Sequence, residues 1–206
     1  MSKKVDLILL QCAIARDDAQ TLLAEFKAKD VARKITVIFS AWAVTQDRAQ
    51  SSAEPGLLHV YLKLDRPRRL TKKDIRKTEK RWKNVCKDPQ AAASRLYKVF
   101  EIAGAATGKN PVCHYVVETT PEKGWFKEIS AWYDQEHMPG LAAVPGCIHA
   151  VRMINMDHGP KSFACYDLVG KDVMGSAPWL KVRATDWSSK CRPHFTNTKR
   201  NMFEVL

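Results

Sequence analysis

The segment from residue 111 to the C-terminus carries a fixed order of strand-like and helix-like patterns, and this order limits the folds open to the chain. Apolar residues alternate with polar ones in short runs and recur at helical spacing in two longer runs. The order is strand, helix, strand, strand, helix, strand, which is typical of an α+β domain with one sheet. The predicted strands are Pro111–Thr119, Cys147–Met156, Lys161–Val169 and Lys199–Val205, and the predicted helical segments are Glu122–Met138 and Ala177–Arg192.

The first half of the chain shows a similar but degenerate order. Because its letters do not repeat those of the second half, a duplication rests on the order of elements alone. We expect two domains, residues 1–104 and 110–206, with a linker at Gly104–Pro111. The predicted strands are Val5–Ala15, Lys34–Val44 and Gly56–Leu64, and the predicted helices are Asp17–Asp30, Thr71–Asp88 and one from Pro89 to about Ala103.

A sheet with both helices on one face leaves its other face bare, so that face must pack against a second sheet. Two fused halves would supply the second sheet within one chain, and two chains could also supply it by dimerising. We expect an internal pseudo-dimer that can still self-associate. A cavity between the sheets would then be the ligand site, since ligand sites are concave and mostly apolar.

The most informative motif is the run WYDQEHMPGLAAVPG, from Trp132 to Gly146. The aromatic and apolar residues before it recur at helical spacing, and Pro139 disfavours helical backbone at Met138. We therefore expect His137 at the C-terminal end of a helix. There the helix dipole favours the charged imidazole whereas burial disfavours it, so His137 is a candidate for proton transfer near neutral pH.

This run, extended to Met153 as WYDQEHMPGLAAVPGCIHAVRM, resembles the W-Y-x-x-E-H-x-P…L…V-P-G-F…A-R motif of EthD-like proteins. The segments Lys161–Val169 and Pro178–Phe195 are also similar to the second half of such domains, so the resemblance covers about Asn110–Leu206. Two positions depart from the motif: Cys147 stands where Phe is usual, and Val151 where a second basic residue is common.

EthD-like proteins belong to the dimeric α/β-barrel superfamily, which is built on a ferredoxin-like βαββαβ unit. The resemblance therefore implies an α+β fold with tandem ferredoxin-like units that form a dimeric α/β-barrel-like sandwich. It also implies a homodimer, and it places the family's recurrent histidine on His137.

Strand alternation adds further candidates for the site. In the strand near residue 115, Cys113 and Tyr115 share the more apolar face, which leaves His114 toward the cavity or solvent. In the next strand we expect Cys147 and His149 on one face, so His149 also becomes a candidate. The predicted catalytic residues are His137, His149, His114 and Tyr166, and the predicted supporting residues are Glu136, Asp134 and Tyr133.

Each candidate also has a structural explanation. A lone strand histidine is more often a hydrogen-bonded core or surface residue than a catalyst. Glu136 and His137 could form a clasp between the helix end and the following turn, and Asp134 could orient His137 or face water. The aromatic residues of the helix, Tyr133 among them, are more typical of a core than of a substrate platform.

The sequence lacks the spacings of metal sites, nucleophile elbows and phosphate loops, so we expect neither a metal nor another cofactor. The remaining chemistry is proton transfer, in which His137 would move the proton while a second histidine or Tyr166 stabilises the developing oxyanion. We therefore expect a cofactor-independent lyase, isomerase or cyclase that acts on a small aromatic or carbonyl compound in catabolism or secondary metabolism. A cofactor-free monooxygenase and a non-catalytic small-molecule binder are the alternatives.

Charge suggests another class of function. The net charge is +12, and residues 65–88 alone carry eleven basic residues against four acidic ones. Such a helix could bind the phosphates of a nucleic acid or attract an anionic substrate. However, Ile75, Trp82 and Val85 suffice for a core-facing stripe, so a solvated helix face is the simpler interpretation. We expect a small, aromatic or anionic substrate as the partner, with nucleic acid the less favoured one.

Localisation is predicted from the cysteines and the apolar runs. The six cysteines form no C-x-x-C pair, and several lie in apolar runs, which is typical of buried free thiols in a reducing compartment. The apolar run near the N-terminus is too short and too interrupted for a signal peptide, and no run approaches the length of a membrane helix. We therefore expect a cytoplasmic protein without a membrane segment.

Overall fold

The structure is a computed structural model that describes residues 3–27, 37–40 and 56–206. The chain divides into two compact units. Unit 1 comprises Met1–Tyr97, Asn155–Gly159 and Phe203–Leu206, and unit 2 comprises Lys98–Ile154 and Pro160–Met202.

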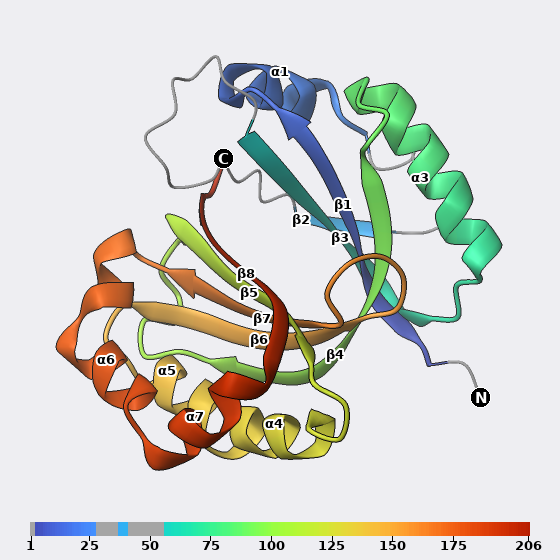
Figure 1. The fold of residues 1–206 in the computed structure, drawn as a ribbon. Helices are drawn as coiled ribbons and strands as arrows, with labels where there is room; N and C mark the ends of the chain where they lie inside the picture. Colours follow the sequence, from blue (N-terminus) through green and yellow to red (C-terminus); the bar gives the residue numbers. More distant parts are fainter. Residues whose placement is uncertain (1–2, 28–36, 41–55) are drawn as a thin grey trace. The chain divides into compact units, whose positions relative to one another are not determined.

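Within its described residues, unit 1 has the order strand, helix, strand, strand, helix, strand. Its strands pair antiparallel in the order β2-β3-β1-β4, and its helices α1 and α3 lie on one face of the sheet (Figure 1). The core between them contains Ile8, Leu10, Val60 and Trp82. The elements are β1 (Val5–Ile14), α1 (Arg16–Glu25), β2 (Val37–Ser40), β3 (Gly56–Arg68), α3 (Lys72–Cys86) and the first part of β4 (Ala92–Ala103).

The helix expected from Pro89 to Ala103 is wrong, because Ala92–Ala103 forms strand β4. The alanines at its start and the preceding proline are local helix signals. They are overridden because residues 92–96 pair with β1, with Leu96 opposite Leu7. Parts of the expected strand Lys34–Val44 and helix Asp17–Asp30, and the loop after residue 44, lie outside the described residues.

Helix α3 begins with a capping box. The Thr71 side chain accepts a hydrogen bond from the Asp74 amide, and the Asp74 carboxylate accepts one from the Thr71 amide. The expected core stripe is confirmed: Ile75 and Trp82 are buried and Val85 packs beside them. Trp82 Nε1 donates to the Gln11 carbonyl over 3.0 Å, which ties α3 to β1.

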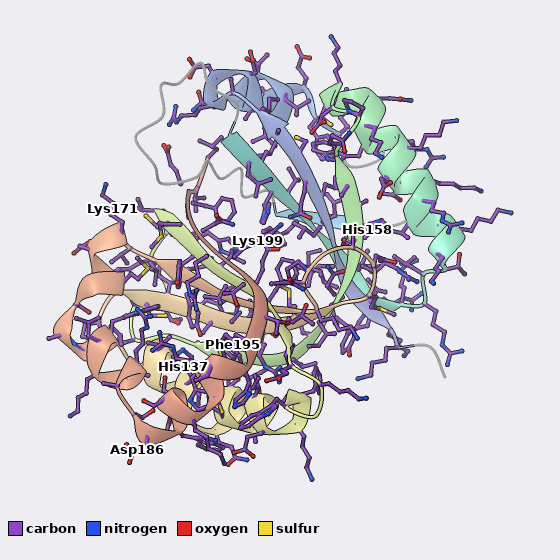
Figure 2. The ribbon with its side chains drawn as sticks, viewed as in Figure 1. His137, His158, Lys171, Asp186, Phe195 and Lys199 are labelled. Atoms are coloured by element: carbon purple, nitrogen blue, oxygen red, sulfur yellow. The ribbon has the colours of Figure 1, made fainter. Side chains whose placement is uncertain are left out.

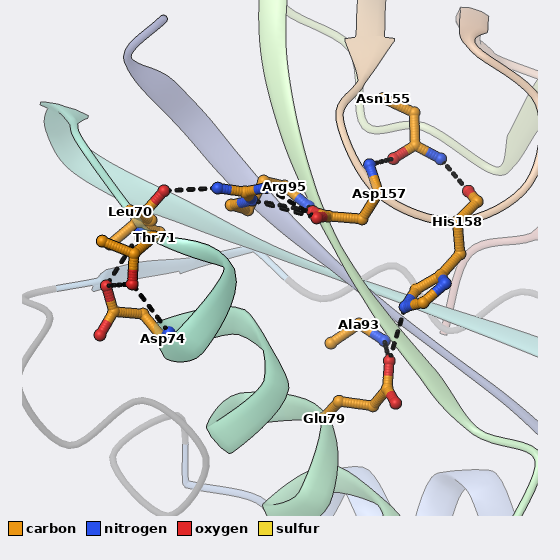
Figure 3. Close-up of polar contacts among 9 residues, drawn as sticks. All are labelled: Leu70, Thr71, Asp74, Glu79, Ala93, Arg95, Asn155, Asp157 and His158. Carbon is orange, nitrogen blue, oxygen red and sulfur yellow. Dashed lines mark hydrogen bonds and ion pairs between the residues drawn. The ribbon is translucent and has the colours of Figure 1, made fainter. Parts of the chain in front are cut away.

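A loop from a distant part of the sequence, Asn155–Gly159, belongs to unit 1 and is held by Arg95 (Figure 3). The Arg95 guanidinium donates to both Asp157 carboxylate oxygens, and its backbone amide donates to Asp157 Oδ2 over 2.8 Å. Arg95 Nη1 also donates to the Leu70 carbonyl over 2.6 Å. Both ion-pair side chains are 7% exposed, so each polar group depends on the other for its partner.

Unit 2 repeats the same order of strands and helices, as expected. Its strands lie in the order β6-β7-β5-β8, and its helices lie on one face of the sheet (Figure 1). The last part of β4 pairs beside β6. The elements are β5 (Cys113–Pro121), α4 (Phe126–Trp132), η1 (Tyr133–His137), α5 (Met138–Ala142), β6 (Cys147–Asn155), β7 (Ser162–Leu168), η2 (Lys171–Gly175), α6 (Ala177–Arg183), α7 (Asp186–Cys191), η3 (Arg192–His194) and β8 (Phe195–Glu204).

The unit 2 core lies between the sheet and these helices. Cys113 and Tyr115 point into it from β5, as expected from the alternation, and Ile129 and Trp132 point into it from α4. All six cysteines of the chain are free thiols, as expected, and all but Cys86 are buried. No helix in the described ranges is long and apolar enough to cross a membrane.

Candidate active site

A pocket opens on the helix-covered face of the unit 2 sheet. Centres of water-sized molecules can occupy about 30 Å³ of it, and the space between its walls is about 390 Å³, part of it open to solvent. The pocket is therefore narrow, and its walls are aromatic side chains interspersed with arginines. The lining residues are Tyr115, Val117, Trp132, Tyr133, His137, Leu141, Tyr166, Trp179, Arg183, Arg192, Phe195 and Arg200.

His137 does not lie at a helix C-terminus, so that expectation is wrong. The five residues Tyr133–His137 form a π-helical turn, and the chain stays helical to Ala142. Pro139 follows the π-turn, in the first turn of α5, and the helix continues through it. The helix end and its dipole are thus one turn beyond His137. A π-turn of this kind is frequent at functional sites.

The His137 ring is enclosed by aromatic side chains. It stacks on Trp132, with ring centroids 4.2 Å apart, and meets the edge of Tyr133 at 5.6 Å. Figure 2 shows His137 beside Phe195, which lines the same pocket. Burial, together with the charges of Arg183 and Arg192, lowers the His137 pKa to about 3. The imidazole is therefore neutral at physiological pH.

Two buried polar atoms of the pocket residues have no hydrogen-bond partner within the described part of the chain. They are His137 Nδ1 and the indole nitrogen of Trp179. Both side chains are nearly buried, at 8% and 1% exposed. An unpartnered buried polar atom is costly and therefore calls for an explanation. A ligand with oxygen atoms would supply an acceptor for the Trp179 N–H.

Tyr166 joins His137 in the pocket, as predicted. Its hydroxyl donates to the Met138 sulfur over 3.1 Å, and its ring packs against Trp179 and Tyr115. Burial raises the pKa of Tyr166 well above its ordinary value, so the phenol stays protonated. It can donate a hydrogen bond to a nearby oxyanion but is a poor source of a free proton.

Three arginines reach the pocket from separate elements: Arg183 from the end of α6, Arg192 from η3 and Arg200 from β8. Within the described residues, none of them forms an ion pair with a carboxylate. Burial and the neighbouring charges of Arg183 and Arg200 lower the pKa of Arg192. Sequence reasoning missed these arginines and Trp179, because no local spacing links residues that only the fold brings together.

The predicted supporting residues do not hydrogen-bond His137. Glu136 accepts hydrogen bonds from Trp132 Nε1 over 3.1 Å and from the Thr185 hydroxyl over 2.6 Å. It thereby fixes the indole on which His137 stacks. Asp134 forms an ion pair with the buried Arg152 over 3.0 Å. Tyr133 contacts His137 directly, through its ring.

The predicted catalytic residues His114 and His149 lie outside the His137 pocket, and both contact the carboxylate of Asp167. His114 Nδ1 lies 2.7 Å from Asp167 Oδ1, and His149 Nδ1 lies 3.5 Å from Asp167 Oδ2. His149 Nε2 also lies 3.1 Å from Glu101 Oε1. Asp167 and the two histidines occupy the face of the sheet opposite to the His137 pocket, and neither histidine lines that pocket.

The expectation that Cys147 and His149 share one face is also wrong. A β-bulge between them shifts the register against β7. Cys147 consequently packs in the helix-side core together with Ala150, whereas His149 pairs with Asp167 on the other face. A bulge of one residue reverses the alternation, which the sequence pattern does not reveal.

Asp167, which sequence reasoning also missed, controls the charge of this second cluster. Burial opposes its ionisation, but hydrogen bonds from His114 and His149 outweigh burial and lower its pKa to about 2. Conversely, the Asp167 carboxylate raises the pKa of His149. In the parts of the chain that the structure describes, no group of three or more His, Cys, Asp or Glu side chains is arranged to hold a metal ion.

Comparison with known proteins identifies the fold. No protein-family model and no curated protein matches the chain. Among solved structures, an anthrone oxidase-like protein is similar, with a TM-score of 0.57 and 12% identity over 100% of this chain and 92% of that chain. A ferredoxin-fold protein related to antibiotic biosynthesis monooxygenases, from Listeria monocytogenes, has a TM-score of 0.53 and 8% identity over 98% and 96%. The heme-degrading enzyme LmHde, also from Listeria monocytogenes, has a TM-score of 0.52 and 7% identity over 97% and 99%.

These similarities confirm the expected α+β, ferredoxin-like fold class. The finer resemblance to EthD-like proteins stays a prediction.

Because one neighbour degrades heme, we tested whether the pocket residues fit a heme. They do not. The space between the pocket walls is about 390 Å³, and a flat porphyrin, which is much wider than one aromatic ring system, would have to displace the buried side chains of Trp132, Tyr133 and Trp179. His137, the histidine of the pocket, is stacked between aromatic rings rather than facing an open plane.

Proposed function

We propose that this protein is a cofactor-independent enzyme that removes a proton from a small aromatic or carbonyl compound. One observation carries the proposal: His137 is neutral, buried and stacked on Trp132, and its Nδ1 has no partner within the described residues. A neutral imidazole at a pocket wall is the form that accepts a proton.

The pocket residues suit the anion that proton removal creates. When a C–H or O–H next to an aromatic ring loses its proton, negative charge develops on the carbonyl or phenol oxygen. Arg183, Arg192 and the Trp179 N–H can stabilise that charge, and the Tyr166 hydroxyl can donate to it in place of the Met138 sulfur. Burial is the main cause of the low His137 pKa, and the charges of Arg183 and Arg192 lower it further. The developing anion offsets these two charges, so His137 becomes a stronger base as the reaction proceeds.

The proposed reaction class is that of a lyase, isomerase or cyclase, in which His137 returns the proton to another atom of the same compound. A cofactor-free monooxygenase is the second candidate, favoured by the names of the anthrone oxidase-like and monooxygenase-related neighbours. Both reactions begin with the same proton transfer. They differ in the next step, because only the oxygenase consumes dioxygen.

Hydrogen–deuterium exchange tests the shared step. Small aryl ketones and phenols with an acidic C–H, together with anthrone, would be incubated with the protein in D₂O and followed by NMR, with dioxygen uptake measured in parallel. We expect accelerated exchange in at least one compound and a loss of about 10²- to 10⁴-fold in His137→Gln. His158→Gln, at an exposed histidine of unit 1, is the control. Exchange that is absent from the whole panel, or unchanged in His137→Gln, would contradict the proposal.

A further inference from the structure

The charge of the pocket exceeds what the proposed proton transfer requires. One positive group is enough to stabilise one developing oxyanion, yet three arginines line the same narrow space. Burial lowers the pKa of Arg192, and the like charges of Arg183 and Arg200 lower it further, so the three side chains repel one another. Within the described residues they have no carboxylate partner. An arrangement of like charges that is unfavourable by itself indicates a ligand with negative charge of its own.

The arginines are also spread over the pocket rather than gathered at His137. The charges of Arg183 and Arg192 lower the pKa of His137. Arg200 is instead the charged group with the largest effect on the pKa of Tyr115. Arg192 is half-buried, and Arg200, on strand β8, is exposed to solvent. The positive charge therefore extends from the buried His137 end toward the solvent-exposed end.

We infer that the substrate is an aromatic carboxylate, whose ring lies between the aromatic walls and whose carboxylate is bound by the arginines, foremost Arg192 and Arg200. This inference rests on the proposed function for the identity of the pocket, but it concerns binding and not catalysis. It divides the pocket into a reacting end at His137 and an anchoring end at the arginines.

A carboxylate fits these residues better than the other acceptor groups do. A guanidinium binds a carboxylate through two parallel hydrogen bonds, and arginine also stacks on aromatic rings. A ring in the pocket can contact the aromatic side chains that line it, among them Trp132, Tyr133 and Trp179. A neutral aromatic compound would fill the same walls but leave the three positive charges unpaired beside it. A polyphosphate would balance the charges but would not use the aromatic walls.

The test uses matched pairs of probes that differ in charge alone. Benzoate and benzamide form one pair, and 1-naphthoate and 1-naphthamide form a larger pair, with phenyl phosphate as a third kind of anion. Binding to the full chain would be measured by calorimetry and by the fluorescence of the pocket tryptophans. We expect each carboxylate to bind at least about tenfold more tightly than its amide.

Arginine variants test which side chains bind the carboxylate. Arg192→Gln and Arg200→Gln should each remove most of the preference for carboxylate over amide, and Arg192→Lys should restore only part of it. Lys181→Gln is the matched control, because it removes one exposed charge from the same helix as Arg183 without touching the pocket. Circular dichroism and urea unfolding identify any variant that fails to fold. If both arginine variants fail to fold, the salt dependence of the wild-type preference decides instead, because a charge-based preference weakens with added salt.

Several results would overturn the inference. They are equal binding of acid and amide, no binding of any probe at about 1 mM, a preference for phenyl phosphate over benzoate, and equal losses in Lys181→Gln and Arg192→Gln. His137→Gln separates this inference from the proposed function. If that variant keeps the preference for carboxylate while no compound exchanges deuterium, the site binds aromatic acids without the proposed chemistry. If exchange occurs but the preference is absent, only the inference fails.

Discussion

The imidazole of His137 lies against the indole of Trp132, with ring centroids 4.2 Å apart and planes inclined by 24°. This stack removes water from one side of the imidazole, and the remaining surroundings bury the rest. A charged imidazolium is therefore strongly disfavoured, and its pKa falls to about 3. A base that is held neutral in this way is available at every physiological pH.

The first prediction concerns the pH dependence of stability. The pKa of His137 is about 6.5 in the unfolded chain and about 3 in the folded one, so the unfolded state binds more protons between these values. Stability should therefore fall as pH decreases below 6.5, by roughly 3 kcal/mol between pH 6.5 and pH 4 from this group. Urea unfolding of the wild type and of His137→Gln over this range measures the difference. The slope should be smaller in His137→Gln than in the wild type. Equal slopes in the two proteins would contradict the prediction.

The second prediction concerns the cluster around Asp167. This carboxylate is the first cause of the raised pKa of His149, so Asp167→Asn should lower that pKa. An NMR titration of the histidine ring protons measures it directly. Because the folded pKa of His149 is raised, its contribution to stability is present at low pH and is lost as pH rises through that pKa. Glu101→Gln, which removes a weaker influence on His149, should cause a smaller change. If Glu101→Gln changed the His149 pKa more than Asp167→Asn does, Asp167 would not be the main cause of the raised pKa.

The third prediction compares two arginine–carboxylate pairs of unit 1. Arg95 and Asp157 are each 7% exposed, whereas Arg16 and Glu204 are 35% and 46% exposed. Arg95→Met would leave the Asp157 carboxylate buried without its main partner, at a cost of about 3 to 5 kcal/mol. Arg16→Met should cost much less, because the exposed pair is screened by water. Urea denaturation of both variants gives the two values, and similar losses would show that burial does not decide the contribution.

Much of the fold follows from periodicity in the sequence, and the failures have specific causes. Elements whose apolar residues recur at the period of a helix or strand and face the core, such as α3 and β5, were predicted correctly. Strand β4 was missed because Ala91–Ala93 after a proline is a local helix signal, although the later run Phe100, Glu101, Ile102 alternates in burial as a strand does. The domain boundary between residues 104 and 110, the homodimer and the cytoplasmic location stay predictions.

The candidate site was only partly predictable for a different reason. His137 and Tyr166 could be found because a motif and a strand pattern point to them. The π-turn was invisible, since nothing in the letters from Tyr133 to His137 requires one extra residue in the turn. The arginines come from α6, η3 and β8, so only the folded chain brings them to one pocket.

The last prediction concerns the close approach of Gly104 to strand β6. The Gly104 amide donates to the Ile148 carbonyl over 2.8 Å, and a Cβ at this position would lie 2.2 Å from the Cys147 carbonyl oxygen. Because the obstructing atoms are backbone, they cannot move aside as a flexible side chain would. Gly104→Ala should therefore destabilise the protein by about 1 to 3 kcal/mol. Gly175→Ala is the control, since a Cβ there meets no atom within 4 Å.

The same substitution should also disturb the bulge that comes after Cys147. A shift of the Cys147 backbone would move His149 relative to Asp167, which it contacts over 3.5 Å. We therefore expect Gly104→Ala to lower the His149 pKa in the NMR titration, since the Asp167 carboxylate is the group that raises it. The His137 pocket lies on the other face of the sheet, so the aromatic stack on Trp132 should persist. A variant as stable as the wild type, with an unchanged His149 pKa, would show that the backbone of β6 adapts without cost.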